Sequence, residues 1–306
     1  RKGAIQLYTP STGTIKQVGF IPVNLTYLDG GQAEDGLLGL AIDPGFAANG
    51  WLYLFYSKAG AEPKNVLARY TMRGDSVDTS TPIVMLEVVV QREQCCHTGG
   101  SIAFDAKGNL FLSTGDNSNP FMNGYAPIDE RPGRMPWDAQ KSSANTNDLR
   151  GKILRIHPEP DGSYTIPEGN LFPPGMAKTR PEIYTMGHRN PYRIAVDKHT
   201  GVLYWGDVGP DASVDSVDRG PAGYDEVGRA TRAGNYGWPH FVGDNKAYRD
   251  VDYATMHIGP PFDPQRPHND SPNNTGLTEL PPAQKAFIWY PYGPSGDFPL
   301  VGAGGR

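Results

Sequence analysis

Residues 95–117 read CCHTGGSIAFDAKGNLFLSTGDN, and this stretch predicts a short β-hairpin with polar groups at its open end. Apolar residues alternate with others on both sides of a turn at Lys107-Gly108-Asn109, as in two half-buried strands. His97 would lie just before the first strand, and Asp116 and Asn117 just after the second. Polar side chains held at strand ends on a rigid sheet favour a functional site.

The pattern of this hairpin occurs three times in the chain. Alanine, an apolar residue and aspartate follow one another from Ala41, Ala103 and Ala195, and an aromatic-rich strand comes after a turn each time. The intervals exceed the roughly 40–50 residues of a common propeller blade, which indicates insertions. No stretch has the amphipathic helical pattern that would cover a parallel sheet. We therefore predict an all-β chain with a β-propeller architecture, and further strands at 4–8, 66–72, 84–90 and 152–157.

Length and composition agree with one domain. An all-β unit can reach the 306 residues of this chain, and its 38 glycines and 29 prolines are spread along it instead of marking one linker. We expect a single domain over residues 1–306, with long loop insertions near 117–150 and 248–282. Loops of this length in a compact domain are often functional.

Charge and hydropathy exclude some classes of partner. The net charge of −5 argues against a nucleic-acid groove or a basic membrane-binding face. No apolar run reaches the roughly 18 residues of a membrane span. The chain begins at Arg1 without a signal-peptide pattern, and two adjacent cysteines do not fix the compartment.

Four segments in this order resemble the soluble quinoprotein glucose/sorbosone dehydrogenase family. They are EDGLLG at 34–39, the hairpin at 95–117, GHRNP at 187–191 and GNYGWP at 234–239. The similarity spans nearly the whole chain, and its Cys-Cys-His variant resembles a bacterial subgroup. Family members are six-bladed propellers that bind pyrroloquinoline quinone (PQQ). The resemblance implies a propeller that is incomplete at both ends of this chain.

The resemblance implies a catalytic base and a catalytic cation. His97 matches the general base that takes a proton from the sugar hydroxyl while hydride passes to the quinone, a task that suits neutral imidazole. Arg189 matches the arginine that stabilises negative charge on the quinone, and Asn190 would contact the same cofactor. Taken alone, His97 also fits a strand-end histidine that bonds a turn, and Arg189 a surface ion pair.

The resemblance also implies calcium. Gly209 and Pro210 match backbone carbonyls that hold a Ca²⁺ ion against the quinone, which the metal would polarise. Asp225 and Glu226 resemble an acidic pair linked to a second, structural calcium in some members. Spacing alone leaves an ordinary Gly-Pro turn and a solvated acidic turn as alternatives.

Other cofactor contacts are predicted with departures from the family pattern. Glu34 stands where one branch of the family has an amide, so its carboxylate would face an anionic cofactor. Asp116 and Asn117 are predicted to contact the cofactor, Asn117 with a shorter amide than the family's. Trp289 lies near the family's aromatic wall, although a core strand is an equal interpretation.

Cys95 and Cys96 leave two possibilities open. Adjacent Cα atoms lie about 3.8 Å apart, below the usual disulfide range, so a disulfide here would be strained and easily reduced. By analogy with an unrelated family of PQQ alcohol dehydrogenases, it could form a flat apolar floor for PQQ. Otherwise two reduced thiols would pack as small apolar groups.

The leading hypothesis is a PQQ- and Ca²⁺-dependent dehydrogenase that oxidises an aldose or sorbosone-type sugar and passes electrons to an acceptor such as a haem protein. One alternative is a non-catalytic propeller that binds carbohydrate or a protein partner. A second is a propeller lactonase that binds calcium without a quinone, which would need several converging carboxylates or amides. The resemblance implies a periplasmic or secreted location.

Overall fold

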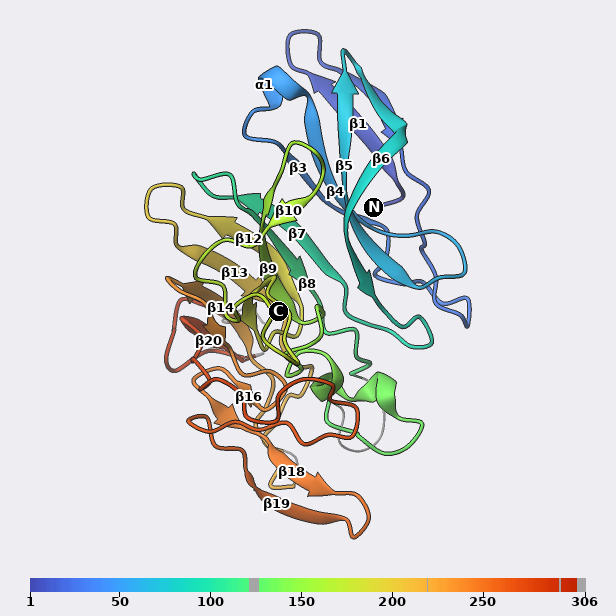
Figure 1. Cartoon of the computed structure of the whole chain (residues 1–306). Helices are drawn as coiled ribbons and strands as arrows, with labels where there is room; N and C mark the ends of the chain where they lie inside the picture. The colour runs from blue at the N-terminus through green and yellow to red at the C-terminus, as the bar shows by residue number, and fades with distance from the viewer. Residues whose placement is uncertain (121–126, 219, 292, 302–306) are drawn as a thin grey trace.

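Three large sheets, mostly antiparallel, follow one another along the described part of the chain (Figure 1). The computed structural model describes residues 1–120, 127–218, 220–291 and 293–301. Blade 1 contains β3 (Leu37–Ile42), β4 (Trp51–Ser57), β5 (Lys64–Arg73) and β6 (Ser76–Val89). Blade 2 contains β7 (Gly99–Phe104), β8 (Leu110–Thr114), β9 (Lys152–Pro158) and β11 (Ile183–Met186), with β10 (Tyr164–Thr165) beside β9 and β15 (Gly234–Asn235) beside β11. Blade 3 contains β12 (Pro191–Val196), β13 (Leu203–Asp207), β14 (Asp225–Ala230) and β20 (Ile288–Tyr290).

The predicted repeat marks the first strand of each blade. Asp43, Asp105 and Asp197 follow the last residues of β3, β7 and β12, and each accepts a hydrogen bond from the backbone N–H two residues later, at 2.8–2.9 Å. Asp favours such turns because its side chain bonds its own backbone. The first strand of blade 2, β7, packs against both β3 and β12. The predicted all-β propeller architecture is confirmed, as are the strands predicted at β1 (Ala4–Thr9), β5, β6 and β9.

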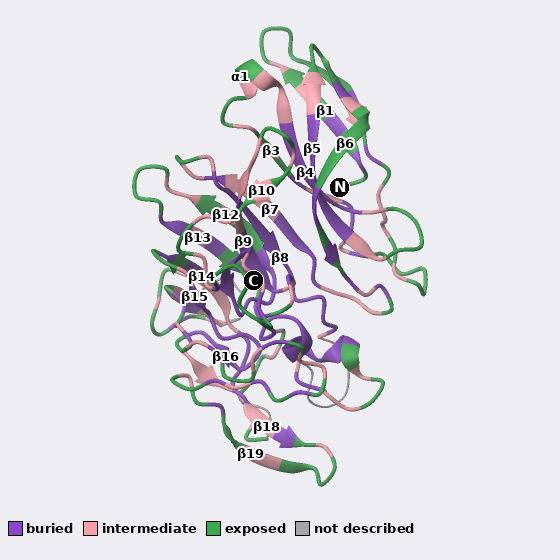
Figure 2. Cartoon of the chain, in the orientation of Figure 1, coloured by how far each residue is buried: buried purple, intermediate pink, exposed green. Residues whose placement is uncertain are grey.

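The middle strand β4 shows why these residues form a sheet with two buried faces. Its side chains alternate between the faces. Tyr53 and Phe55 enter the core shared with blade 2. Leu52 and Leu54 pack against the hairpin of β1 and β2 (Thr14–Phe20) on the other face. Full burial of such side chains stabilises the fold by about 1.5–3 kcal/mol each, and Figure 2 shows β4 as mostly buried.

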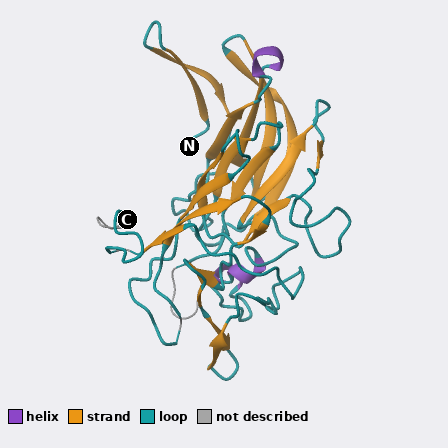
Figure 3. Ribbon diagram, turned by 90° about the vertical axis from the view of Figure 1, so that its left-hand side faces the viewer, coloured by secondary structure: helices purple, strands orange, loops and turns teal. Residues whose placement is uncertain are grey.

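The long connections gather at one end of the sheets, opposite α1 (Phe46–Asn49) (Figure 3). The insertion at 117–150 holds two short 3₁₀ turns, η1 (Met135–Trp137) and η2 (Ala139–Lys141). The remaining strands are β16 (Phe241–Val242), β17 (Lys246–Ala247), β18 (Arg249–Asp252) and β19 (His257–Pro261).

The segment 248–282 differs from its prediction as a region without strands. β18 and β19 pair there as a short antiparallel hairpin. They were missed because two prolines end β19 and the strands are too short to show alternation. In the part of the chain that the structure describes, no helix has the length and apolar character needed to cross a membrane.

Candidate active site

A cavity of about 160 Å³ lies among the loops of blades 2 and 3. Four predicted site residues line it, namely His97, Asp116, Arg189 and Pro210. Three of the segments that carry the family resemblance therefore meet here, since Trp238 from the GNYGWP segment lines the cavity as well. Proline and small polar residues of the 117–150 insertion complete one wall.

His97 is held by a buried carboxylate. Its Nδ1 lies 2.8 Å from Asp116 Oδ1, and both side chains are almost fully buried. An ionised carboxylate can only accept hydrogen bonds, so a neutral His97 ring carries its proton on Nδ1. Nε2 is then the basic nitrogen, which is the state that a general base needs.

Asp116, which the sequence predicts as a cofactor contact, lines the cavity with its carboxylate held between several donors. Oδ1 also accepts from the Ser118 backbone at 2.9 Å, and Oδ2 accepts from Trp238 Nε1 at 2.9 Å. The backbone N–H of Asp116 donates to the Arg189 carbonyl at 2.8 Å. Asp116 therefore links His97 to the segment that carries Arg189.

Arg189 and Asn190 are fixed by the end of β13. Their backbone N–H groups donate to the Asp207 carboxylate at 3.3 and 2.6 Å. Arg189 Nη1 donates to the Val208 carbonyl at 2.8 Å, and the side chain is buried, so a surface ion pair does not describe it. Asn190 Oδ1 accepts from the Gly99 N–H at 3.2 Å, which ties this segment to β7.

Asn117 and Glu34 lie beside the cavity lining. Asn117 Oδ1 accepts from the Gln91 backbone at 2.6 Å and from Arg150 Nη1 at 3.2 Å. Glu34 Oε2 accepts from the Thr98 N–H at 3.1 Å, one residue beyond His97. In this structure both side chains hold the backbone around the site.

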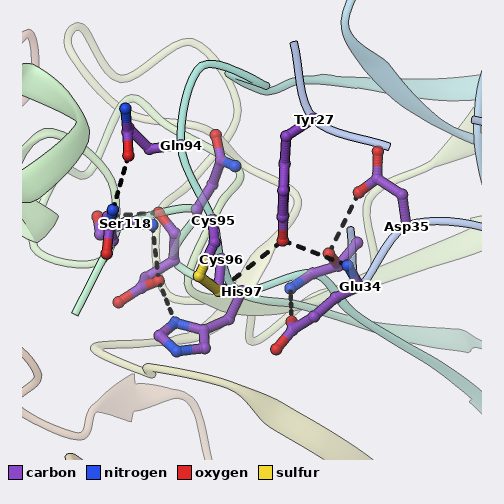
Figure 4. Close-up of a disulfide and its surroundings, with 12 residues drawn as sticks. Tyr27, Glu34, Asp35, Gln94, Cys95, Cys96, His97 and Ser118 are labelled. Carbon is purple, nitrogen blue, oxygen red and sulfur yellow. Dashed lines mark hydrogen bonds and ion pairs between the residues drawn. A yellow bond between two sulfur atoms is a disulfide. The ribbon is translucent and has the colours of Figure 1, made fainter. Parts of the chain in front are cut away.

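Cys95 and Cys96 form a disulfide directly before His97 (Figure 4). The Tyr27 hydroxyl lies 3.8 Å from Cys96 Sγ and accepts from the Glu34 N–H at 3.2 Å. Burial raises the pKa of Tyr27 to about 12, so its hydroxyl stays protonated at neutral pH. Neither cysteine belongs to the described lining of the cavity.

Three of the four residues predicted for calcium line a small neighbouring hollow. Gly209, Pro210 and Glu226 line it together with Arg189 and Trp238. The Gly209 N–H donates to Asp225 Oδ1 at 2.8 Å, and the Gly243 N–H donates to Glu226 Oε1. Burial, with Asp207 nearby, raises the pKa of Glu226 to about 8. Among the residues that the structure describes, no three His, Cys, Asp or Glu side chains converge on a metal position.

Trp289 lies away from the cavity, whereas Trp238 lines it. Trp289 lies on β20, packs edge-to-face on Phe298 with ring centroids 4.8 Å apart, and does not line the cavity. Trp238 lines the cavity, as does Tyr248; Trp238 belongs to the GNYGWP motif, in which no role was predicted for it. The signal in the sequence was the position of Trp238 between glycine and proline in the GNYGWP segment.

A pH-sensitive carboxyl lies in the insertion that forms one cavity wall. Burial, followed by the charge of Asp138, raises the pKa of Glu130 from 4.5 to about 7. Because the folded chain holds this proton more tightly than the unfolded chain, the stabilisation is full below pH 4.5 and is lost as pH rises through about 7.

We expect Glu130→Gln to flatten the loss of stability between pH 5 and 8, because the amide stays neutral throughout. Urea unfolding at several pH values measures this effect. Glu93→Gln, at an exposed carboxylate, is the matched control. Parallel stability curves for wild type and Glu130→Gln would contradict the prediction.

The comparisons with known proteins agree with this geometry. The glucose/sorbosone dehydrogenase family model matches residues 1–264. The chain is 26% identical over 263 residues to quinoprotein glucose dehydrogenase B of Acinetobacter calcoaceticus, covering 82% of this chain and 49% of that protein. It is 28% identical over 216 residues to human Hedgehog-interacting protein, covering 65% of this chain and 28% of that protein. The PQQ-bound aldose sugar dehydrogenase of Streptomyces coelicolor matches in fold, with a TM-score of 0.56, 24% identity, and coverage of 85% of this chain and 61% of that one.

These matches differ in how much of each relative they include. The chain spans about half the length, or less, of these curated relatives. The family match nevertheless covers most of the chain and includes every residue that lines the cavity. This chain therefore belongs to the glucose/sorbosone dehydrogenase family.

Proposed function

We propose that this chain provides the catalytic part of a PQQ- and Ca²⁺-dependent dehydrogenase that oxidises an aldose or sorbosone-type sugar. The observation that carries the proposal is the meeting of His97, Asp116 and Arg189 in one cavity. The names of the relatives support it, because one is a quinoprotein glucose dehydrogenase and another is a PQQ-bound aldose sugar dehydrogenase.

The cavity residues suit such a cofactor. PQQ is a flat quinone that carries carboxylates, so it needs a cation and a planar neighbour. Arg189 supplies a buried cation, whose guanidinium bonds a neutral carbonyl, and Trp238 supplies an aromatic ring. Gly209 and Pro210 would offer carbonyl oxygens to Ca²⁺, which accepts such ligands.

PQQ and the protein would supply different parts of the reaction. PQQ, when bound, supplies an electrophilic carbonyl that accepts hydride from the sugar carbon. His97 Nε2 takes the proton of the sugar hydroxyl, and the Asp116 carboxylate stabilises the imidazolium that results. Arg189 places a permanent positive charge where negative charge develops. The hydroxyl carbon loses one hydride and its oxygen loses one proton, which gives a lactone or, after hydrolysis, an acid.

PQQ titration tests the proposal. We expect absorbance and thermal-shift titrations with and without Ca²⁺ to show calcium-dependent binding that Arg189→Ala removes. The experiment uses residues 1–306 and, in parallel, any longer chain that contains them. Absence of PQQ binding in both would overturn the proposal, and dye-linked sugar screens follow a positive result.

A second candidate is a propeller that binds a partner without catalysis. The similarity to human Hedgehog-interacting protein favours it. A protein that binds carbohydrate or a protein ligand but neither binds PQQ nor reduces dye would fit this candidate.

The proposed enzyme would work outside the cytoplasm, in the periplasm or after secretion, with a haem protein as a suitable electron acceptor.

A further inference from the structure

We propose that Trp238 is a positioning residue that joins the base and the cation of the site through its indole N–H and its ring. The inference rests on the proposed function for its catalytic meaning. In this role, Trp238 fixes the orientation of the Asp116 carboxylate, and the carboxylate fixes the orientation of the His97 ring.

The hydrogen bonds of Asp116 show how this works. Oδ1 faces His97 Nδ1 at 2.8 Å, while Oδ2 accepts from Trp238 Nε1 at 2.9 Å. Rotation of the carboxylate about its Cβ–Cγ bond would break both contacts together. The indole therefore fixes the plane of the carboxylate, and this plane fixes the orientation of the imidazole. All three side chains are buried, so water does not easily replace a lost donor.

Trp238 is itself anchored to the segment that carries Arg189. Its backbone N–H donates to the Gly187 carbonyl at 3.0 Å, and the Tyr236 N–H donates to the Met186 carbonyl at 2.8 Å. The Arg189 guanidinium carbon lies 5.9 Å from the centre of the indole ring, at the outer range of a cation–π contact. One side chain thus contacts both chemical groups of the site, although 122 residues separate it from Asp116.

The indole N–H also tunes the charge at the base. The positive end of the N–H dipole points at the Asp116 carboxylate and offsets part of its negative charge. The carboxylate therefore stabilises a positively charged His97 ring less strongly. Removing this donor should make His97 easier to protonate. Lys141 and Arg150, which act electrostatically on Asp116, and Arg189 and Asp211, which line the cavity, are all unchanged by such a substitution. A shift can therefore be assigned to the indole.

Trp238→Phe tests the inference because it keeps a buried ring and removes the N–H. In the PQQ-free protein, we expect the NMR titration midpoint of His97 to rise by about one pH unit. In dye-linked sugar oxidation, kcat should fall about 10- to 100-fold with little change in KM, and the acidic limb of the pH profile should move the same way.

Trp51→Phe is the matched control, since Trp51 packs under Arg69 at 3.9 Å in blade 1, away from the cavity. If phenylalanine destabilises the domain, a benzothienyl side chain at position 238 removes the N–H at nearly constant shape. An unchanged His97 titration in Trp238→Phe, or in the benzothienyl variant where phenylalanine destabilises the domain, would overturn the inference. Because that readout needs neither PQQ nor sugar, a failure of the proposed function would show separately, as a wild-type protein that oxidises no sugar.

Discussion

Replacing His97 with glutamine is expected to lower kcat for sugar oxidation by about 10²- to 10⁴-fold, the usual contribution of a general base. Glutamine can still donate a hydrogen bond to Asp116, so the buried carboxylate keeps a partner. It has no basic nitrogen at neutral pH, so the sugar hydroxyl keeps its proton. Dye-linked kinetics with PQQ and Ca²⁺ present measure the loss.

His157→Gln is the control for this substitution. His157 lies on β9 of the same blade, and its Nδ1 is 3.0 Å from Asn109 Oδ1, so it resembles His97 in its hydrogen bonding. It does not line the cavity, and we expect its variant to keep the wild-type kcat. A His97→Gln enzyme as active as the control would exclude His97 as the base.

The blades could be predicted from sequence because their signals are local. Asp43, Asp105 and Asp197 each bond a backbone N–H only two residues away, so the residues that form the turn are adjacent in the sequence. The alternation that leads into each turn is likewise contained in a few residues. The repeat therefore predicted the first strands of blades 1, 2 and 3.

The contacts of the site could be predicted only in part, because most of them join distant segments. The Trp238–Asp116 hydrogen bond and the Asn190–Gly99 hydrogen bond, across 91 residues, leave no periodic pattern in the sequence. Resemblance to a family identified residue types at the site, and His97 and Arg189 do line one cavity. It could not show that the Asn117 amide bonds Gln91, or that Trp289 packs on Phe298 away from that cavity.

Replacing Arg92 with methionine is expected to lower the free energy of unfolding by about 3–5 kcal/mol, the usual effect of leaving one charge of a buried pair alone. Arg92 Nε lies 3.1 Å from Asp35 Oδ2, and the two side chains are only 5% and 7% exposed. Arg92 also donates to the Lys58 carbonyl at 2.8 Å. The variant therefore leaves a buried carboxylate and a half-buried carbonyl with fewer donors. Urea unfolding with an unchanged m-value measures the loss.

The double variant Arg92→Met with Asp35→Leu separates the unpaired charge from the lost packing. With no buried charge left, we expect it to recover part of the stability, whereas equal losses in both variants would contradict the electrostatic explanation. The pair also matters for the site, because Thr98 Oγ1 donates to Asp35 Oδ1 and the Thr98 N–H donates to Glu34. The Asp35 and Glu34 carboxylates both accept hydrogen bonds from Thr98, the residue after His97. Because the double variant lacks the Asp35 carboxylate, we expect it to regain stability without regaining full kcat. That difference would show that the buried pair positions the catalytic turn in addition to stabilising the fold.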